Sequence, residues 1–339
     1  MTRRTLAIVL LVAAFAGSLA VPALVAGGAV AIALSAFRIG TAAAIGSALV
    51  LSWLAKAAKY LLLARRLRQP VGFGDCLLIS LGCDFAFMAT PGGLGGYPAT
   101  IYLGRRAGMA PACSAAIAGA DQVLDLLFFA AAVPLAAVSM LAAHVDAMPR
   151  VDARPILLIA AVTGLSAVLL RRIGRKYRIV IGWPLPTNYR DRLAVQWRQV
   201  VARLGDLRRG SPRFMAGLFA ATATQWLARY AVLGLAASAA GWPVPFAAVV
   251  LIQALALHAG QWTGVPGGIG GADVIVAEAL KPWAPVEATA GILVVWRLAT
   301  FHLSLCVGAL AFAVLAGRRR GIAFENAPRD GRVALAEPH

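Results

Sequence analysis

Apolar stretches of about 18 residues or more recur along this chain, and a helix of that length crosses roughly 30 Å of hydrocarbon. The composition agrees: of the 339 residues, 60% are hydrophobic and 14% are charged, and the mean hydropathy is +0.78. Soluble domains are about 45–50% apolar and about 25% charged. These values exclude a soluble enzyme, a secreted disulfide scaffold and a disordered chain. We therefore predict an all-α membrane protein, a polytopic helical bundle.

Most of the positive charge lies beside the apolar stretches. The chain has 32 Lys and Arg against 14 Asp and Glu, a net charge of +18, and residues 171–213 alone carry 12 basic and 2 acidic side chains. Smaller basic clusters are Arg3–Arg4, Arg65–Arg68, Arg105–Arg106 and Arg318–Arg320. Basic clusters that flank membrane spans stay in the cytoplasm. Topology thus explains the charge without a nucleic-acid partner, and predicts a bacterial cytoplasmic (inner) membrane protein with both termini cytoplasmic.

A hexapeptide of sequence P-G-G-[LI]-G-G occurs at residues 91–96 and again at 266–271, an offset of 175. Each copy follows a half-length apolar segment and precedes a short helix and a very long one. Glycine weakens a helix interior by roughly 1 kcal/mol and proline by about 3, so neither copy continues a helix. If Arg65–Arg68 and Arg105–Arg106 are both cytoplasmic, the chain between them enters and leaves the membrane on one side, as a re-entrant hairpin.

The two copies are predicted to enter from opposite sides of the membrane. The positive-inside rule directs the helix before the first copy inward and the helix at 213–239 outward. This is an inverted-topology repeat, the architecture of many secondary transporters. The expected boundaries are repeat 1 at about 40–141, a cytoplasmic basic loop at 171–212, repeat 2 at about 213–317, one transmembrane domain over 1–320, and a disordered cytoplasmic tail at 321–339.

The expected helices can be given by residue range. They lie at about 5–26, 40–64, 73–90, 97–103, 111–141, 155–170, 213–239, 244–265, 272–281 and 286–316. The basic segment 171–213 also contains apolar residues at helical spacing, which indicates either an amphipathic helix on the anionic inner leaflet or a solvated basic loop.

The two glycine breaks suggest a binding site. Backbone groups freed at membrane depth are tolerated only inside protein or beside a wet cavity, so breaks that meet from opposite faces are expected to line one polar cavity. The short helices starting near Tyr97 and Ala272 would offer free N–H groups and positive dipole ends to an anion such as a phosphate. The alternative is that the glycines only allow close helix packing.

Charged residues inside apolar stretches need a partner or a function, because a mid-bilayer charge costs at least about 2.5–3.5 kcal/mol. Asp121 and Asp125 are four residues apart and share a helix face. They either hold a proton between them, as a proton-coupling site, or form a structural pair with Arg229 or Arg297.

Lys56 and Lys59 lie near the inner end of their helix and are predicted to snorkel to the surface. The sequence contains no nucleophile elbow, P-loop or zinc motif. We therefore expect no enzymatic activity, no cofactor and no metal.

Three segments resemble the flippase-like membrane family, which is related to the membrane region of lysylphosphatidylglycerol synthase/flippase. They are Thr90–Gly96, Arg105–Met109 and Asp121–Asp125. The second copy, Val265–Gly271 with Asp273 and Trp296–Leu298, is similar to that family's second glycine motif and its following arginine. The resemblance covers about residues 5–318 and implies a multi-helix inner-membrane protein linked to moving or presenting modified lipids.

The chain departs from this family at two places. Gln122 stands where an arginine usually follows the first acidic residue, and Tyr97-Pro98 replaces an acidic residue that Asp273 keeps in the second copy. Only about 20 residues follow the last expected helix, so the family's aminoacyl-transfer domain is not expected and neither is lipid aminoacylation.

The predicted function is a membrane lipid transporter or flippase that binds an anionic lipid headgroup between the two glycine-rich loops. The alternative is a non-transporting scaffold or accessory subunit for a lipid- or glycan-modifying enzyme. The expected partners are membrane lipids and, under the alternative, such an enzyme. The predicted substrate-binding residues are Pro91, Gly92, Gly93, Gly95, Gly96, Arg106, Asp121, Asp125, Pro266, Gly267, Gly268, Gly270, Gly271, Asp273 and Arg297.

Overall fold

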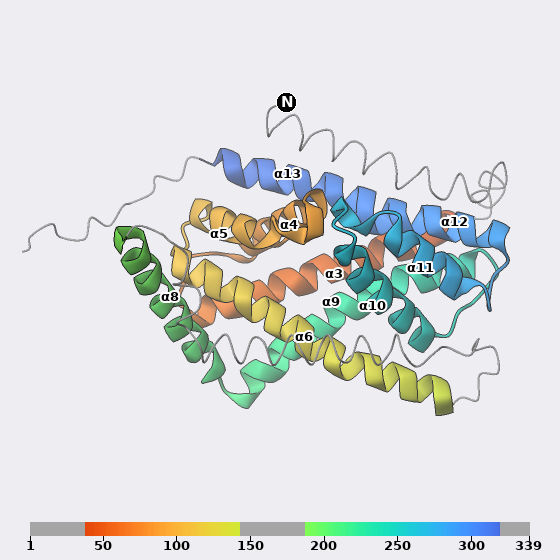
Figure 1. The fold of residues 1–339 in the computed structure, drawn as a ribbon, viewed down its shortest axis with the longest axis horizontal. Helices are drawn as coiled ribbons and strands as arrows, with labels where there is room; N and C mark the ends of the chain where they lie inside the picture. The colour runs from red at the N-terminus through yellow and green to blue at the C-terminus, as the bar shows by residue number, and fades with distance from the viewer. Residues whose placement is uncertain (1–37, 143–186, 319–339) are drawn as a thin grey trace, which may run out of the picture.

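The computed structural model describes residues 38–142 and 187–318, and every regular element in these two ranges is helical (Figure 1). The helices predicted at 5–26 and 155–170 and the tail at 321–339 lie outside the described residues. Three described helices are long and apolar enough to cross a membrane, namely Ile39–Arg66, Pro111–Ala142 and Val286–Gly317. The prediction of an all-helical membrane fold is confirmed.

The first described half contains one short break between helices of very different length. Its elements are α3 (Ile39–Arg66), α4 (Phe73–Ala89), the 3-10 turn η1 (Pro91–Gly93), α5 (Gly96–Arg106) and α6 (Pro111–Ala142). Helix α4 stops because the next residues cannot continue it: Thr90 is extended, and Gly92 has a φ of +60°. The predicted helix at 73–90 and the break that follows it are thus both present.

The second half repeats this order. Its elements are α8 (Thr187–Arg208), α9 (Pro212–Ala239), α10 (Phe246–Trp262), the 3-10 turn η3 (Pro266–Gly268), α11 (Gly271–Leu280), α12 (Val286–Arg297), the π-helical turn η4 (Leu298–Leu303) and α13 (Ser304–Gly317). Ser211 caps α9 by accepting a hydrogen bond from the amide of Phe214, and Pro212 occupies the first helical position. Helices α3 and α9 are both 28 residues long, and α4 and α10 are both 17.

The long helix predicted at 286–316 is present but not regular. Its middle turn, Leu298–Leu303, is a π-helix, which separates α12 from α13. A π-turn widens the backbone repeat and displaces carbonyl groups from the usual i to i+4 bonding. The π-helical turn could not be predicted from the sequence, because its residue types also occur in ordinary α-helices.

The two halves pack against each other in a reciprocal pattern. Helix α3 runs against α9, and turn η1 touches turn η3. Helix α4 packs on α13 and α10 packs on α6, while α4 also contacts η3 and α10 contacts η1 (Figure 1). Both proline-glycine turns therefore lie at the centre of the described fold, although 175 residues separate them in the sequence.

Two large apolar cores lie on either side of this centre. One gathers Leu49, Val249, Val276 and Ile292 with their neighbours from α3, α9, α10, α11 and α12. The other gathers residues of α3, α4, α5, α6, α8 and α13, such as Leu63, Leu103 and Leu315. A small cluster of Met88, Ile269, Phe301 and Leu305 joins α4, η4 and α13 to the residue that follows turn η3.

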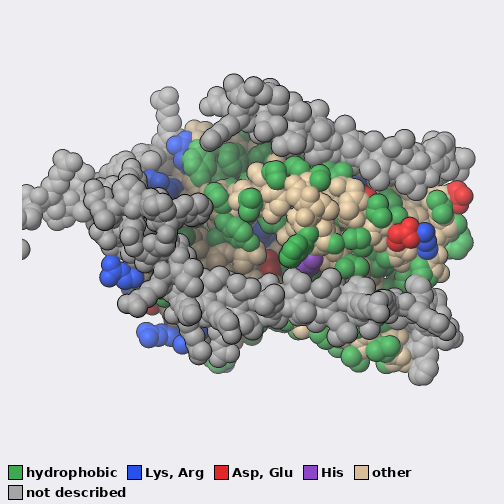
Figure 2. Space-filling view, viewed as in Figure 1, with side chains coloured by type: hydrophobic (Ala, Val, Ile, Leu, Met, Phe, Trp, Pro, Cys, Tyr) green, Lys and Arg blue, Asp and Glu red, His purple; other side chains and the backbone are tan. Residues whose placement is uncertain are grey.

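The basic clusters of the described ranges meet at one end of the molecule. Arg66 donates to the carbonyl of Arg209 at 3.2 Å, Arg318 pairs with Asp75 at 2.6 Å, and Arg106 donates to the carbonyl of Ala316. Helix α8 lies at this end, where Figure 2 shows Lys and Arg side chains gathered. The described part of the basic segment is a helix rather than a loop, with Val200 and Leu207 buried and Arg203 exposed.

Helices α4 and α13 approach closely at Gly308. A Cβ atom added there would lie 2.6 Å from the carbonyl oxygen of Leu81 and 2.8 Å from Cβ of Phe85. We expect Gly308→Ala to lower the free energy of unfolding by about 1–3 kcal/mol, because backbone cannot move aside cheaply. Thermal unfolding of the detergent-purified protein measures this loss.

Gly46→Ala is the matched control. Gly46 lies inside α3 and an added Cβ meets nothing within 4 Å, so the variant should keep or gain stability through better helix propensity. Equal destabilisation by the two substitutions would contradict the close packing of α4 on α13.

Candidate functional site

A cavity of about 290 Å³ lies between the two halves. Helices α3, α4, α5, α6, α9, α10 and α12 and both turns contribute to its wall. Figure 2 shows acidic, basic and histidine side chains inside a hollow in the middle of one face. The predicted site residues in the wall are Gly92, Gly93, Gly96, Asp121, Asp125, Gly267, Gly268 and Arg297.

The glycines of the two turns allow close approaches that a side chain would block. Gly268 has a φ of +63°, and an added Cβ would lie 2.9 Å from Cα of Gly260 in α10. Gly267 has a φ of +65° and packs on the ring of Phe301, where an added Cβ would clash. At these positions the glycines therefore do both: they allow close packing, which was the alternative above, and they line the cavity.

One backbone amide beside each turn is bound by a side chain of this protein. The hydroxyl of Thr90 donates to the carbonyl of Ala86 at 2.7 Å and accepts from the amide of Gly95 at 2.8 Å. At the second turn, the carboxylate of Asp273 accepts from the amide of Gly270 at 2.8 Å. The amides of Gly95 and Gly270, two of the predicted substrate-binding residues, are therefore not free to hold a phosphate, because they already donate to side chains.

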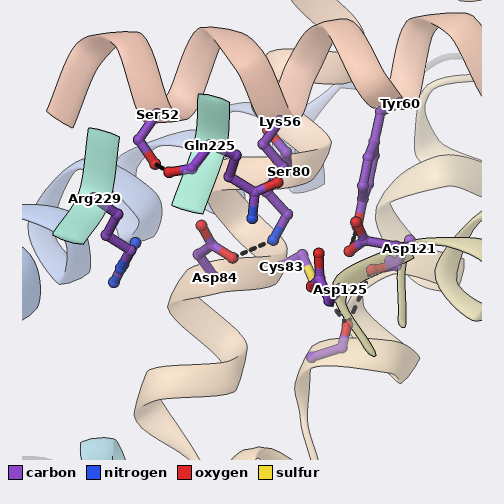
Figure 3. Close-up of polar contacts among 12 residues, drawn as sticks. Ser52, Lys56, Tyr60, Ser80, Cys83, Asp84, Asp121, Asp125, Gln225 and Arg229 are labelled. Carbon is purple, nitrogen blue, oxygen red and sulfur yellow. Dashed lines mark hydrogen bonds and ion pairs between the residues drawn. The ribbon is translucent and has the colours of Figure 1, made fainter. Parts of the chain in front are cut away.

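Lys59 joins two carboxylates in the first half. Its Nζ lies 2.5 Å from Asp121 and 3.0 Å from Asp125, and none of its side chain is exposed. Tyr60 donates to Asp121 at 3.1 Å (Figure 3). Trp226 donates to Asp125 at 2.9 Å. The triad of Asp121, Lys59 and Asp125 carries one more negative than positive charge.

A second lysine makes a separate pair. Lys56, one turn before Lys59 on α3, lies 2.5 Å from Asp84 on α4 (Figure 3). The prediction that both lysines snorkel is wrong: Lys56 is 8% exposed and Lys59 is fully buried. Their positive charges are retained in the interior because α4 and α6 each present carboxylates to α3.

In the second half an arginine takes this role. Arg297 lies 2.5 Å from Asp273 through Nε and donates through Nη1 to the carbonyl of Gly267 at 3.2 Å. Its guanidinium also lies over the ring of Trp296, 4.7 Å from the centroid. Arg297 therefore braces the second turn against α11 and α12. The prediction that Asp121 and Asp125 pair with Arg229 or Arg297 is wrong.

Arg229 is the cavity cation that pairs with no carboxylate among the described residues. Its Nη2 donates to the carbonyl of Thr300 in the π-turn, at 3.1 Å. Arg229 is the eighteenth residue of α9, and Lys56 is the eighteenth residue of α3. The two packed helices thus present one cation each to the cavity, at the same distance from the start of each helix.

Apart from Oδ1 of Asp121, which is paired with Lys59, three buried polar atoms in the wall have no hydrogen-bond partner in the described structure. They are Oε1 of Gln225, the hydroxyl of Tyr230 and Nη2 of Arg297. These three residues are at most 5% exposed. Since an unsatisfied buried polar atom costs about 1–3 kcal/mol, the cavity is suited to a polar ligand or to water.

An aromatic group forms another side of the cavity. Phe129 lies 4.9 Å from Trp226 and 5.2 Å from His258, measured between ring centroids, with an edge-to-face arrangement toward the histidine. The described residues contain no group of three His, Cys, Asp or Glu side chains that could hold a metal ion. The wall therefore combines charged pairs, free polar atoms and aromatic surface.

Several predicted site residues do not line the cavity. They are Pro91, Gly95, Arg106, Pro266, Gly270, Gly271 and Asp273. Arg106 lies at the basic end, where it donates to the carbonyl of Ala316. Gly270 and Asp273 are bound to each other at the start of α11, next to the second turn. The wall residues Gln225, Trp226 and Tyr230 were not predicted for the site, because nothing local in α9 distinguishes them from other helical polar and aromatic residues.

A family model described as the lysylphosphatidylglycerol synthase TM region matches residues 5–308. The chain belongs to this family. The match covers nearly all of the described residues, including both turns and the cavity wall. The resemblance inferred from the glycine motifs is thereby confirmed.

One relative of this family member is a UPF0104 membrane protein from Archaeoglobus fulgidus. It is 22% identical over 274 residues, which is 76% of this chain and 81% of the archaeal protein. The membrane assignment of the chain agrees with this relative's description.

The triad predicts an unequal cost for removing two lysines of this family member. Lys59→Met leaves two buried carboxylates without their cation, so we expect a loss of about 3–5 kcal/mol in the free energy of unfolding at neutral pH. The loss should shrink as pH falls, because protonation removes the uncompensated charge. Chemical denaturation of the detergent-purified protein at several pH values measures both effects.

Lys281→Met provides the control. Lys281 pairs with Glu278 at 2.6 Å, but both side chains are more than half exposed. An exposed pair of this kind contributes about 0–1 kcal/mol. Comparable losses for the two variants would show that Lys59 is not a buried partner of the two aspartates.

Proposed function

We propose that this protein is a membrane lipid transporter that receives the anionic headgroup of a lipid between its two proline-glycine turns. The observation that carries the proposal is the central cavity between the halves, in which Arg229 has no carboxylate partner among the described residues. Charged and polar groups inside a membrane bundle are typical of a substrate pathway. Membership of the lysylphosphatidylglycerol synthase TM-region family is consistent with a lipid substrate.

The proposed headgroup site lies on the α9 and α12 side of the cavity. Arg229 would attract the phosphate, and the unpartnered atoms of Arg297 and Tyr230 would donate to its oxygens. Arginine suits phosphate because its planar guanidinium donates two parallel hydrogen bonds. The acyl chains would stay in the bilayer while the headgroup crosses through the cavity.

The proposed architecture is an inverted-topology repeat with two re-entrant hairpins. The equal lengths of α3 and α9 and of α4 and α10 support it, as does the reciprocal packing of α4 on α13 and α10 on α6. Two hairpins that enter from opposite faces of the membrane would meet at their turns, and η1 does contact η3. Rocking of one repeat against the other would then expose the cavity to each side in turn.

We further propose that the basic end of the molecule faces the cytoplasm of a bacterial inner membrane. The convergence of Arg66, Arg106, Arg209 and Arg318 supports this orientation. In a variant whose native cysteines are replaced, an impermeant thiol reagent added outside the cell should label a cysteine at Lys281 and spare one at Arg209. Labelling of Arg209→Cys from outside would reverse the proposed orientation.

Transport is tested in proteoliposomes of phosphatidylcholine with a minor fraction of fluorescent phosphatidylglycerol. The wild-type protein should accelerate exchange of the labelled lipid between leaflets. Arg229→Gln should slow it by roughly tenfold to a hundredfold, because a hydrogen bond to a charged group contributes about 1.5–3 kcal/mol. Quenching of the outer-leaflet label over time measures the rate.

The control is Arg203→Gln, which removes an exposed arginine whose partner is Asp206 on the same helix. This variant should transport like the wild type. Equal exchange in vesicles with and without protein, for phosphatidylglycerol and other anionic lipids, would contradict the proposed transport.

A second candidate is a scaffold that recruits a lipid- or glycan-modifying enzyme. The amphipathic character of α8 favours it, since Val200 and Leu207 are buried while Arg203 and Arg208 stay exposed. Removing the segment 171–208 distinguishes the two. A scaffold should lose its cellular role, whereas lipid exchange by the purified protein should persist in a transporter.

A further inference from the structure

The charges around the cavity balance overall but are unequally divided. Lys56 with Asp84 and Arg297 with Asp273 are one-to-one pairs. The triad of Asp121, Lys59 and Asp125 has one excess negative charge, and Arg229 has one positive charge without a carboxylate partner among the described residues. The two unmatched charges belong to opposite halves and both face the same cavity.

Loading of an anionic headgroup changes this balance. The phosphate would neutralise Arg229 and leave the negative charge of the triad uncompensated inside the membrane, where an unpaired charge is costly. A second positive ligand would restore neutrality. This inference rests on the proposed headgroup site and concerns what must bind together with the headgroup.

We propose that a proton binds to the Asp121–Asp125 pair when an anionic headgroup enters the cavity, so that the two are transported together. The step is COO⁻ + H⁺ → COOH on one carboxylate, with Lys59 remaining a cation beside the other. A proton fits better than a second ammonium or metal cation. Lys59, Tyr60 and Trp226 already occupy donor positions around the two carboxylates, at 2.5–3.1 Å.

The triad is open to the cavity, so a proton can reach it. Asp121 and Asp125 both belong to the cavity wall. Lys56 and Asp84 line the cavity too, and Figure 3 draws them with Gln225, Asp121 and Asp125. Gln225 and Tyr230 belong to the same wall, and each has a buried polar atom without a partner in the part of the chain that the structure describes. Such atoms are suited to bind water that carries protons between the cavity and the carboxylates.

Other ionisable groups share the cavity and belong to its charge balance. From α3, α4, α5, α9, α10 and α12 they are Lys56, Tyr60, Cys83, Asp84, Tyr97, Arg229, Tyr230, His258 and Arg297. Asp84 has its own lysine, and His258 lies against Phe129 with its Nδ1 2.7 Å from the carbonyl of Ala254. The triad is therefore the group in the described wall with more carboxylates than cations.

The first experiment measures proton uptake. A short-chain phosphatidylglycerol is added to the detergent-purified protein in weakly buffered solution that contains a pH indicator. The wild type should take up about one proton per bound lipid, and its affinity should rise by up to about tenfold per unit of falling pH, because proton and lipid binding favour each other. Asp125→Asn should bind the lipid with no proton uptake and little pH dependence.

Asp125→Asn is expected to fold. The amide keeps an oxygen acceptor for Trp226 and leaves Lys59 paired one-to-one with Asp121. Glu278→Gln is the control, since it also removes one carboxylate but at an exposed position outside the cavity. It should retain the proton uptake of the wild type.

The outcomes separate the two proposals. If the wild type binds lipid without taking up a proton, the proposed proton site is refuted while the proposed lipid site is kept. Lipid binding that requires sodium in place of protons would also refute the proton site. Absence of lipid binding would refute the proposed function. In that case the proton site is tested by infrared difference spectra between acidic and neutral pH. A carboxylic-acid band that is present in the wild type and lost in Asp125→Asn supports the proton site. An identical band in both proteins rules it out.

Discussion

The ion pairs that α3 makes with α4 and α6 hold the first half of this protein together. Hydrocarbon cannot solvate a charge, so Lys56 and Lys59 are tolerated in the interior only where neighbouring helices supply carboxylates. Asp84 comes from α4 and Asp121 and Asp125 come from α6. The positions of three helices around the cavity are thereby linked through two side chains of α3.

The second half meets the same constraint differently. Arg297 joins Asp273 at the start of α11 to the carbonyl of Gly267 in the turn. The offset of 175 places Gln122 opposite Arg297 and Pro98 opposite Asp273, so the first turn has no such brace. Its backbone is satisfied by Thr90 instead. The halves share an order of elements but divide their charges unequally, with the excess carboxylate on one side and Arg229 on the other.

Much of the helical order was predictable because its causes are local. The predicted ranges 40–64 and 111–141 correspond to Ile39–Arg66 and Pro111–Ala142. Apolar length, proline and glycine decide where a membrane helix begins and ends, and all three can be read from neighbouring residues. The π-turn at Leu298–Leu303 was missed, since nothing in its residue types distinguishes it from the α-helix around it.

The sequence by itself determined the membrane class, the family, the main helices and the two breaks, because each depends on residues adjacent in the chain. Only the tertiary structure decided which charges meet. Lys59 and Asp125 are 66 positions apart, and their pairing depends on how α3 packs against α6. Helical periodicity shows the face on which a side chain lies but not the helix that covers it. For the same reason Arg106, on the short helix that follows a glycine motif, lies at the basic end, whereas Arg229, far from both motifs in sequence, faces the cavity.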